Sequence, residues 1–196
     1  SDVIHPGYIA INTAADSSGY VVRNNYIHEN RARGFLLQSS CGLCENNRFY
    51  KTQMQAIKIV VDIIPDLWQE GTGVNTLKIR GNTFEQCVVG ENSEVITLST
   101  GLNGRPADGY AFENIEITGN TFIAFPGRLV NASNVNGFLF ADNTVNADSI
   151  RNALSFGAYC ENMQIRDNGW AGTGAWFAEF PRCKTLREWI LLYSGM

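Results

Sequence analysis

A short pattern centred on asparagine recurs six times along the chain, and it constrains the fold more than any other feature. In each copy an asparagine follows Asn, Gly or Asp and precedes an apolar residue by two positions. The six anchors are Asn25, Asn47, Asn82, Asn120, Asn143 and Asn168, separated by 22, 35, 38, 23 and 25 residues. The short spacings define a unit of about 23 residues, and the two long spacings add about a dozen more.

Apolar residues form columns when the copies are aligned on these anchors. Residues five and three positions before an anchor are mostly apolar, as expected for side chains two apart on one face of a strand. The residue two positions after the anchor is apolar as well. The residue just before each anchor is of a type that tolerates a left-handed backbone at a corner. The column three before the anchor is Val22, Cys44, Ile79, Ile117, Phe140 and Ile165, and the column two after it is Ile27, Phe49, Phe84, Phe122, Val145 and Trp170.

A second strand follows in each unit, over residues 34–37, 56–59, 95–98, 129–132, 153–156 and 175–177. Short strands, tight corners and a fixed period predict an all-β right-handed parallel β-helix, a solenoid of about seven coils. Residues 8–11 match the second strand of an earlier coil. We expect one domain over residues 1–196, with coils in 7–180 and a helical or irregular cap in 181–196 over the last coil. We also expect an upstream segment or a partner to cover the amino-terminal end, because residues 8–11 already match a coil strand and no cap precedes them. The start at Ser1 suggests a processed product or a piece of a longer chain.

The anchor asparagines allow two interpretations. They could be ligand contacts, or they could form a buried ladder in which side-chain amides bond to the backbone and to each other at an inward corner. The columns favour the ladder. Cys44 falls in an apolar column, which favours a packed thiol over a zinc or redox role for the Cys41–Cys44 pair.

Composition excludes several classes of partner. Of the 196 residues 44% are hydrophobic, 17% are charged, and the net charge is −4 without a basic run. Nucleic acid and anionic membrane surfaces are therefore poor candidates, and the apolar stretches are too short to span a bilayer. The residues predict neither a metal site nor a cofactor.

The two long units contain insertions over residues 61–74 and 99–111, which follow the same strand in neighbouring coils and should protrude side by side. The first carries Asp62, Trp68 and Glu70, and the second carries Arg105. An aromatic ring beside carboxylates and an arginine suits a carbohydrate. A solvated loop that happens to hold a tryptophan explains the composition equally well. Arg31 and Arg33 lie at a corner before the second strand, where one of them could reach the face of the Trp68 loop or both could be surface charges.

The chain resembles the later coils of α-1,3-galactosidases of glycoside hydrolase family 110. The resemblance runs from about residue 10 to residue 146, and its most specific parts are the Asn-Arg-Ala-Arg-Gly string at 30–34 and the Trp-Gln-Glu-Gly string at 68–71. Membership would imply hydrolysis of a terminal α-linked galactose with inversion and without a metal. It would also imply that some catalytic aspartates lie in coils upstream of this segment.

These observations predict a carbohydrate-active β-helix protein that hydrolyses or binds α-linked galactosyl or related glycans. The expected carboxylates are Asp62 and Glu70, with Arg31, Arg33 and Arg105 contacting substrate and Trp68 as the stacking platform. The alternatives are a non-catalytic glycan-binding module, a structural β-helix and a polysaccharide lyase. We expect an extracellular or periplasmic location; the oligomeric state is open.

Overall fold

The described part of the chain is all-β apart from one short 3-10 helix. The computed structural model describes residues 12–90, 93–124, 128–146, 152–171, 176–179 and 191–192. The helix η1 (Thr13–Ala15) begins after Asn12, whose side chain accepts from Ala14 N at 3.1 Å. No helix among these residues is long and apolar enough to cross a membrane.

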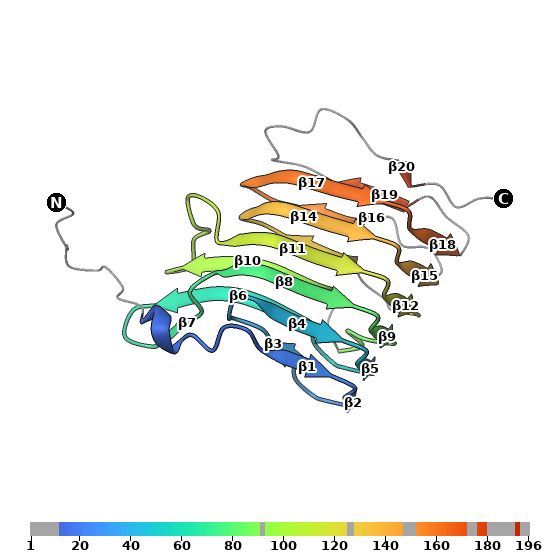
Figure 1. Cartoon of the computed structure of the whole chain (residues 1–196), viewed down its shortest axis with the longest axis horizontal. Coiled ribbons are helices and arrows are strands. Elements are labelled where there is room, and N and C mark those ends of the chain that lie inside the picture. Colours follow the sequence, from blue (N-terminus) through green and yellow to red (C-terminus); the bar gives the residue numbers. More distant parts are fainter. Residues whose placement is uncertain are drawn as a thin grey trace.

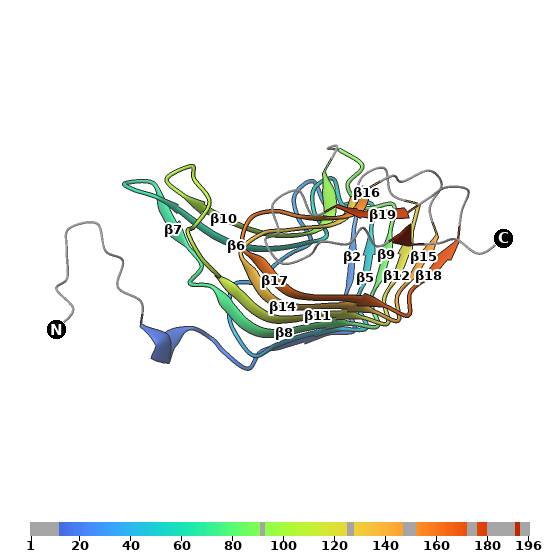
Figure 2. The same cartoon turned by 90° about the horizontal axis from the view of Figure 1, so that it is seen from above.

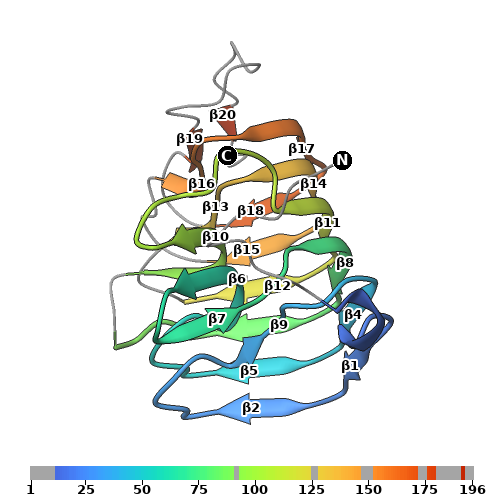
Figure 3. The same ribbon diagram turned by 90° about the vertical axis from the view of Figure 1, so that its left-hand side faces the viewer.

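Three sheets of parallel strands run along the solenoid, and each coil contributes one strand to each sheet (Figures 1 and 3). Sheet A contains β1 (Val21–Arg23), β4 (Gly42–Glu45), β8 (Val74–Arg80), β11 (Phe112–Thr118), β14 (Val135–Ala141) and β17 (Cys160–Arg166). Sheet B contains β2 (Tyr26–His28), β5 (Arg48–Tyr50), β9 (Thr83–Glu85), β12 (Thr121–Ile123), β15 (Thr144–Asn146) and β18 (Gly169–Ala171).

Sheet C contains β3 (Phe35–Leu36), β6 (Ile57–Ile64), β10 (Glu94–Leu102), β13 (Arg128–Ala132), β16 (Asn152–Phe156) and β19 (Trp176–Glu179). Two further strands pair antiparallel at this sheet: β7 (Trp68–Glu70) with β6, and β20 (Leu191–Leu192) with β19. The predicted second strand of each unit is sheet C. The predicted first strand is divided by the anchor corner into a sheet A strand and a sheet B strand.

The predicted apolar columns are confirmed by the strand register. Val22, Cys44 and Ile79 are successive Cα partners in sheet A, and the column continues through Ile117, Phe140 and Ile165. In sheet B the rings of Phe49 and Phe84 stack with centroids 5.0 Å apart, and those of Phe84 and Phe122 are 4.8 Å apart. Side chains of one column therefore stack along the axis and form the core.

The asparagine ladder is confirmed as well. Asn47 accepts from Asn25 N and Nδ2, at 3.0 and 2.9 Å, and its own Nδ2 donates to Asn82 Oδ1 at 3.0 Å. The same contacts repeat through Asn120, Asn143 and Asn168. The residues just before the anchors all have positive φ, between 54° and 63°: Asn24, Asn46, Gly81, Gly119, Asp142 and Asp167.

Few residues of the predicted first coil strand and of the predicted C-terminal cap are described by the structure. The earlier coil at residues 8–11 lies outside the described residues, and so does the cap at 181–196 apart from Leu191–Leu192. Those two residues form an extended strand, not a helix. Six described coils are seen, and the predicted seventh coil and right-handed winding stay predictions.

Candidate functional site

The two predicted insertions protrude side by side at the corner between sheets C and A (Figure 2). The first insertion, residues 61–74, begins within a hairpin of β6 and β7, which we name the first hairpin, residues 57–70. We name the second insertion, residues 99–111, the second loop. The β10 strand pairs with β6 as far as Leu102 opposite Ile63, and Asn103 N donates to Ile63 O at 2.7 Å. The second loop therefore begins directly beside the first hairpin.

The first hairpin brings three of the predicted site residues onto one face. Asp62 is the Cα partner of Glu70, and Ile64 is the partner of Trp68, so Asp62, Glu70 and Trp68 alternate onto the same side of the ribbon. Ile63 packs against the core, which places the other side of the ribbon inward and the carboxylates outward. Side chains of directly opposed antiparallel residues start about 5 Å apart.

Trp68 is 43% exposed and its neighbour Leu67 is 69% exposed, which leaves a broad apolar surface at the hairpin tip. Asp62 packs over Gly101 on β10, where an added Cβ would lie 2.9 Å from Asp62 Oδ1. A glycine at this position leaves room for the Asp62 carboxylate over β10.

Arg105 lies in the turn of the second loop. Leu102 N donates to Arg105 O at 2.6 Å and Arg105 N donates to Leu102 O at 3.1 Å, so residues 102–105 close a tight turn with the Arg105 side chain exposed. This turn continues the pairing of β10 beside the first hairpin, which puts Arg105 on the same corner as Asp62 and Trp68.

Arg31 and Arg33 lie elsewhere. They precede β3, whose Phe35 pairs with Ile57 at the start of β6, whereas Trp68 pairs with Ile64 at its end. Seven residues of strand separate those two positions, about 23 Å. Arg31 is exposed, and Arg33 is half-buried with its Nε lacking a hydrogen-bond partner. A site shared by Trp68 with either arginine, which the sequence allowed, is not formed, because they occupy opposite ends of sheet C.

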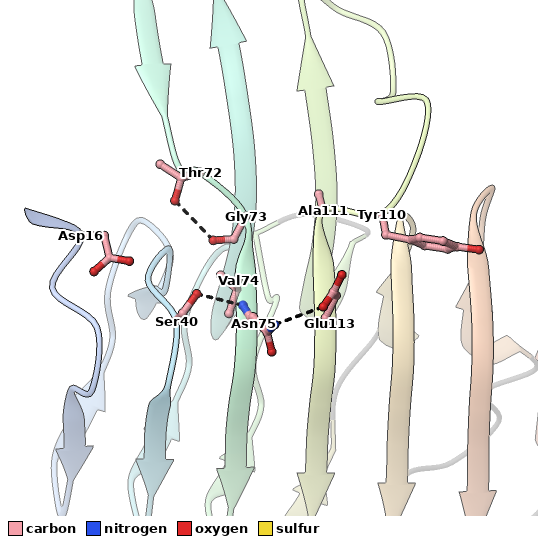
Figure 4. A pocket seen from close by; sticks show the side chains of 9 residues that line it. All are labelled: Asp16, Ser40, Thr72, Gly73, Val74, Asn75, Tyr110, Ala111 and Glu113. Carbon is pink, nitrogen blue, oxygen red and sulfur yellow. Dashed lines mark hydrogen bonds between the residues drawn. The ribbon is translucent and has the colours of Figure 1, made fainter. Parts of the chain in front are cut away.

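A pocket of about 320 Å³ opens where the two insertions return to sheet A (Figure 4). It is lined by Asp16, Ser40, Thr72, Gly73, Val74, Asn75, Tyr110, Ala111 and Glu113. Figure 4 shows Asp16 at one side and Glu113 with Tyr110 at the other, with Ser40 and Asn75 between them. The volume is at the lower end of the range typical of small-molecule sites.

The polar groups of the pocket are held by one another. Asn75 N donates to Ser40 Oγ at 3.0 Å, and Asn75 Nδ2 donates to Glu113 Oε2 at 3.1 Å. The Asp16 carboxylate accepts from Ser18 N and Oγ at 3.0 and 2.8 Å. None of the nine lining residues carries a positive charge, so the pocket suits a hydroxyl-rich neutral ligand better than an anion.

Glycines let the chain return from the first hairpin to the pocket. Gly71 and Gly73 have φ of +78° and +95°, and a Cβ on them would lie 2.2 Å from Val60 O and 2.6 Å from Ala111 O. Any side chain here would strain the backbone and collide with a neighbouring carbonyl. The pocket lining therefore resumes at Thr72, two residues after Glu70.

Comparison with curated proteins finds relatives over part of this chain. Alpha-1,3-galactosidase A of Bacteroides fragilis is 34% identical over 127 residues, which are 63% of this chain and 21% of the relative. The Shewanella woodyi protein of the same name is 31% identical over 59% of this chain and 19% of the relative. Alpha-1,3-galactosidase B of Bacteroides thetaiotaomicron is 27% identical over 74% of this chain and 24% of the relative.

Over this segment the chain is similar to proteins named α-1,3-galactosidase. The matched segment spans about a fifth to a quarter of the length of these proteins. No protein-family model matches the chain.

Sequence reasoning missed the pocket residues. Asn75 and Glu113 stand just past the exits of the two insertions, and Tyr110 stands near the end of the second loop. The usable signal was position, because residues at the exits of two adjacent insertions meet on neighbouring strands. Asp16 and Ser40 gave no such signal, since they come from coils without a long insertion.

Proposed function

We propose that this protein recognises α-linked galactosyl glycans at the corner between sheets C and A and hydrolyses them there. The observation that carries the proposal is the register of the first hairpin, which sets Asp62 opposite Glu70 with Trp68 on the same face. The pocket of hydroxyl, amide and carboxylate groups at the same corner of the solenoid would hold the terminal sugar. The relationship to proteins named α-1,3-galactosidase supports the sugar and the linkage.

In the proposed reaction one carboxyl of the pair is protonated and gives its proton to the glycosidic oxygen as the bond from the anomeric carbon breaks. The other accepts a proton from water as the water oxygen bonds to the anomeric carbon. Trp68 would stack on the apolar face of a sugar ring, and Arg105 would donate to hydroxyls. In inverting enzymes the two carboxyls are about 6.5–9.5 Å apart and in retaining ones about 5–5.5 Å, so the anomer released from the substrate reports which geometry forms.

The test uses the full chain, a chromogenic α-galactoside and the disaccharide galactosyl-α-1,3-galactose. Asp62→Asn and Glu70→Gln should each lower the rate of galactose release by about 10²-fold or more, because each removes one proton-transfer group. Asp66→Asn is the matched control, a carboxylate in the turn of the same hairpin, and should leave the rate unchanged. Circular dichroism should be the same for all variants.

Full activity in both hairpin variants would refute the assignment of the carboxylates. A wild-type chain that binds the disaccharide without turnover would refute hydrolysis and leave the glycan-binding module, the alternative that the same corner supports.

A further inference from the structure

Exposed large hydrophobic side chains gather on the corner that holds the pocket. Of the large hydrophobic side chains exposed in the described residues, Leu67, Trp68, Leu102, Tyr110 and Tyr159 all belong to this corner or its insertions. Burying such groups would release free energy, so an exposed cluster of them indicates a surface that contacts something else. The proposed terminal-sugar pocket uses Tyr110 but leaves Tyr159 without a role.

Tyr159 lies two coils beyond the pocket. The pairing of Phe112 with Val135 and of Val135 with Cys160 puts the residues just before them, Ala111, Asn134 and Tyr159, in one column. Two coils advance about 9.6 Å along the axis, so Tyr159 stands about that far beyond Ala111. In Figure 4 the Tyr110 side chain points away from Asn75, towards the side of the strands coloured as β14 and β17.

The second loop, which contains Tyr110, is hydrogen-bonded to the coils that lead to Tyr159. Asn134 is fully buried, its Nδ2 donates to Ala107 O and Gly109 O at 2.7 Å each, and its Oδ1 accepts from Thr100 Oγ1 at 2.9 Å. The Tyr159 hydroxyl donates to Asp108 Oδ1 at 3.4 Å. These bonds join the second loop to the next two coils beyond the pocket.

A column of polar side chains continues from the pocket in the same direction. Asn75 pairs with Glu113, Glu113 with Asn136, and Asn136 with Glu161, so one hydrogen-bonding residue faces outward on each successive coil. With Ser40 before Asn75, the column spans five coils and about 19 Å. Its members are hydroxyl, amide and carboxylate groups throughout, the groups that pair with sugar hydroxyls. The next outward column of sheet A includes leucines at 43 and 139, so an all-polar column is not imposed by the fold.

We infer that this corner binds a glycan of several sugar units laid along the solenoid axis, with its terminal unit in the pocket and a later unit stacked on Tyr159. The inference rests on the proposed function and extends it from a terminal galactose to an oligosaccharide. A pyranose unit in an extended chain advances by about the rise of one coil, so successive units meet successive members of the polar column. The ring of Tyr159 then provides a second stacking surface beyond Tyr110.

The experiment compares the affinities for a short and a long ligand by calorimetry. The probes are galactosyl-α-1,3-galactose and a tetrasaccharide that ends in the same disaccharide, and Glu70→Gln is the background throughout to stop turnover. The background protein should bind the tetrasaccharide about tenfold or more tighter than the disaccharide. Adding Tyr159→Ala should remove most of that difference and leave the disaccharide affinity unchanged.

Two control variants separate stacking from other effects. Tyr159→Phe keeps the ring and loses only the contact with Asp108, so it should retain the length dependence. Tyr26→Ala removes another exposed aromatic, on sheet B, and should change neither affinity.

Equal affinities for the two probes, or a preference for the tetrasaccharide that persists in Tyr159→Ala, would overturn the inference. Binding of the disaccharide in the same experiment would leave the proposed recognition of galactosyl glycans standing. Failure of both probes to bind would overturn the proposed function, and the inference with it.

Discussion

The buried asparagine ladder makes a sharp prediction about stability. The side chain of Asn120 is 1% exposed and forms four hydrogen bonds. Its Oδ1 accepts from Asn82 N and Nδ2 at 2.9 and 3.0 Å, and its Nδ2 donates to Ile79 O and Asn143 Oδ1 at 2.9 and 3.0 Å. Replacing Asn120 by Ala removes all four.

The cost depends on which partners are left without a bond. Asn82 Nδ2 keeps Cys44 O, Asn143 Oδ1 keeps Asn120 N, and Ile79 lies in a strand paired on both sides. Asn82 N alone becomes a buried donor without an acceptor, which costs about 1–3 kcal/mol, and the other lost bonds add about 1 kcal/mol. We therefore expect Asn120→Ala to lower the free energy of unfolding by about 3 kcal/mol. For a chain of this length that corresponds to a fall in Tm of about 6–12 °C.

Asn25 is the matched control, because it is the exposed first member of the ladder and accepts no hydrogen bond from another described side chain. Its Nδ2 donates to Arg23 O and Asn47 Oδ1, and Asn47 Oδ1 keeps the bond from Asn25 N. Asn25→Ala should cost less than about 1 kcal/mol. Urea and thermal unfolding followed by circular dichroism measure both values. Equal costs for the two substitutions would refute the ladder reasoning.

Two further predictions concern packing inside the coils. Burial raises the pKa of the Cys44 thiol from its ordinary value of 9.0 to about 12. Iodoacetamide at pH 8 should therefore label exposed Cys41 in the folded protein and Cys44 only after urea is added. Peptide mass spectrometry measures the labelling of each cysteine. Because the pKa of Cys44 is higher in the folded than in the unfolded protein, the stability contributed by the neutral thiol is complete below about pH 9 and is lost as the pH rises towards 12. A midpoint of unfolding that stays constant across that pH range would contradict this loss of stability. A Cβ on Gly34 would lie 2.5 Å from Ala56 O and 2.8 Å from Phe49 Cδ1. Gly34→Ala should therefore lower the free energy of unfolding by about 1–3 kcal/mol in the same unfolding assay. An unchanged midpoint would argue against the close contact of Gly34 with Ala56 and Phe49.

Much of the fold follows from the sequence because its determinants are local and repeated. The anchor asparagines, the left-handed residue before each and the apolar columns around Ile79 and Phe84 all recur at one spacing. Each coil buries its apolar side chains only by stacking on the next, so alignment of the repeats is also alignment in space. For the same reason the sequence predicted that the two insertions would protrude together. It marked a corner at each anchor but did not assign the strands on either side of that corner to two different sheets, A and B.

The candidate site is only partly accessible to such reasoning. That Asp62 and Glu70 would oppose each other depends on the antiparallel return of β7 along β6, which no repeat in the sequence specifies. The predicted grouping of Arg31 and Arg33 with Trp68 failed because a repeat fixes which coil a residue belongs to but not the end of a long strand on which it lies.

The sequence by itself determined a stacked all-β chain with an inward amide on every coil and two outward insertions. Only the tertiary structure decided which outward residues meet. The pocket takes Asp16, Ser40, Asn75 and Glu113 from four successive coils, and Tyr159 joins the second loop across two more. Residues at inward positions must be apolar or form the asparagine ladder because they are buried, so they recur periodically in the sequence. Outward positions are free of that constraint, and their neighbours are set by register and by how each insertion folds back.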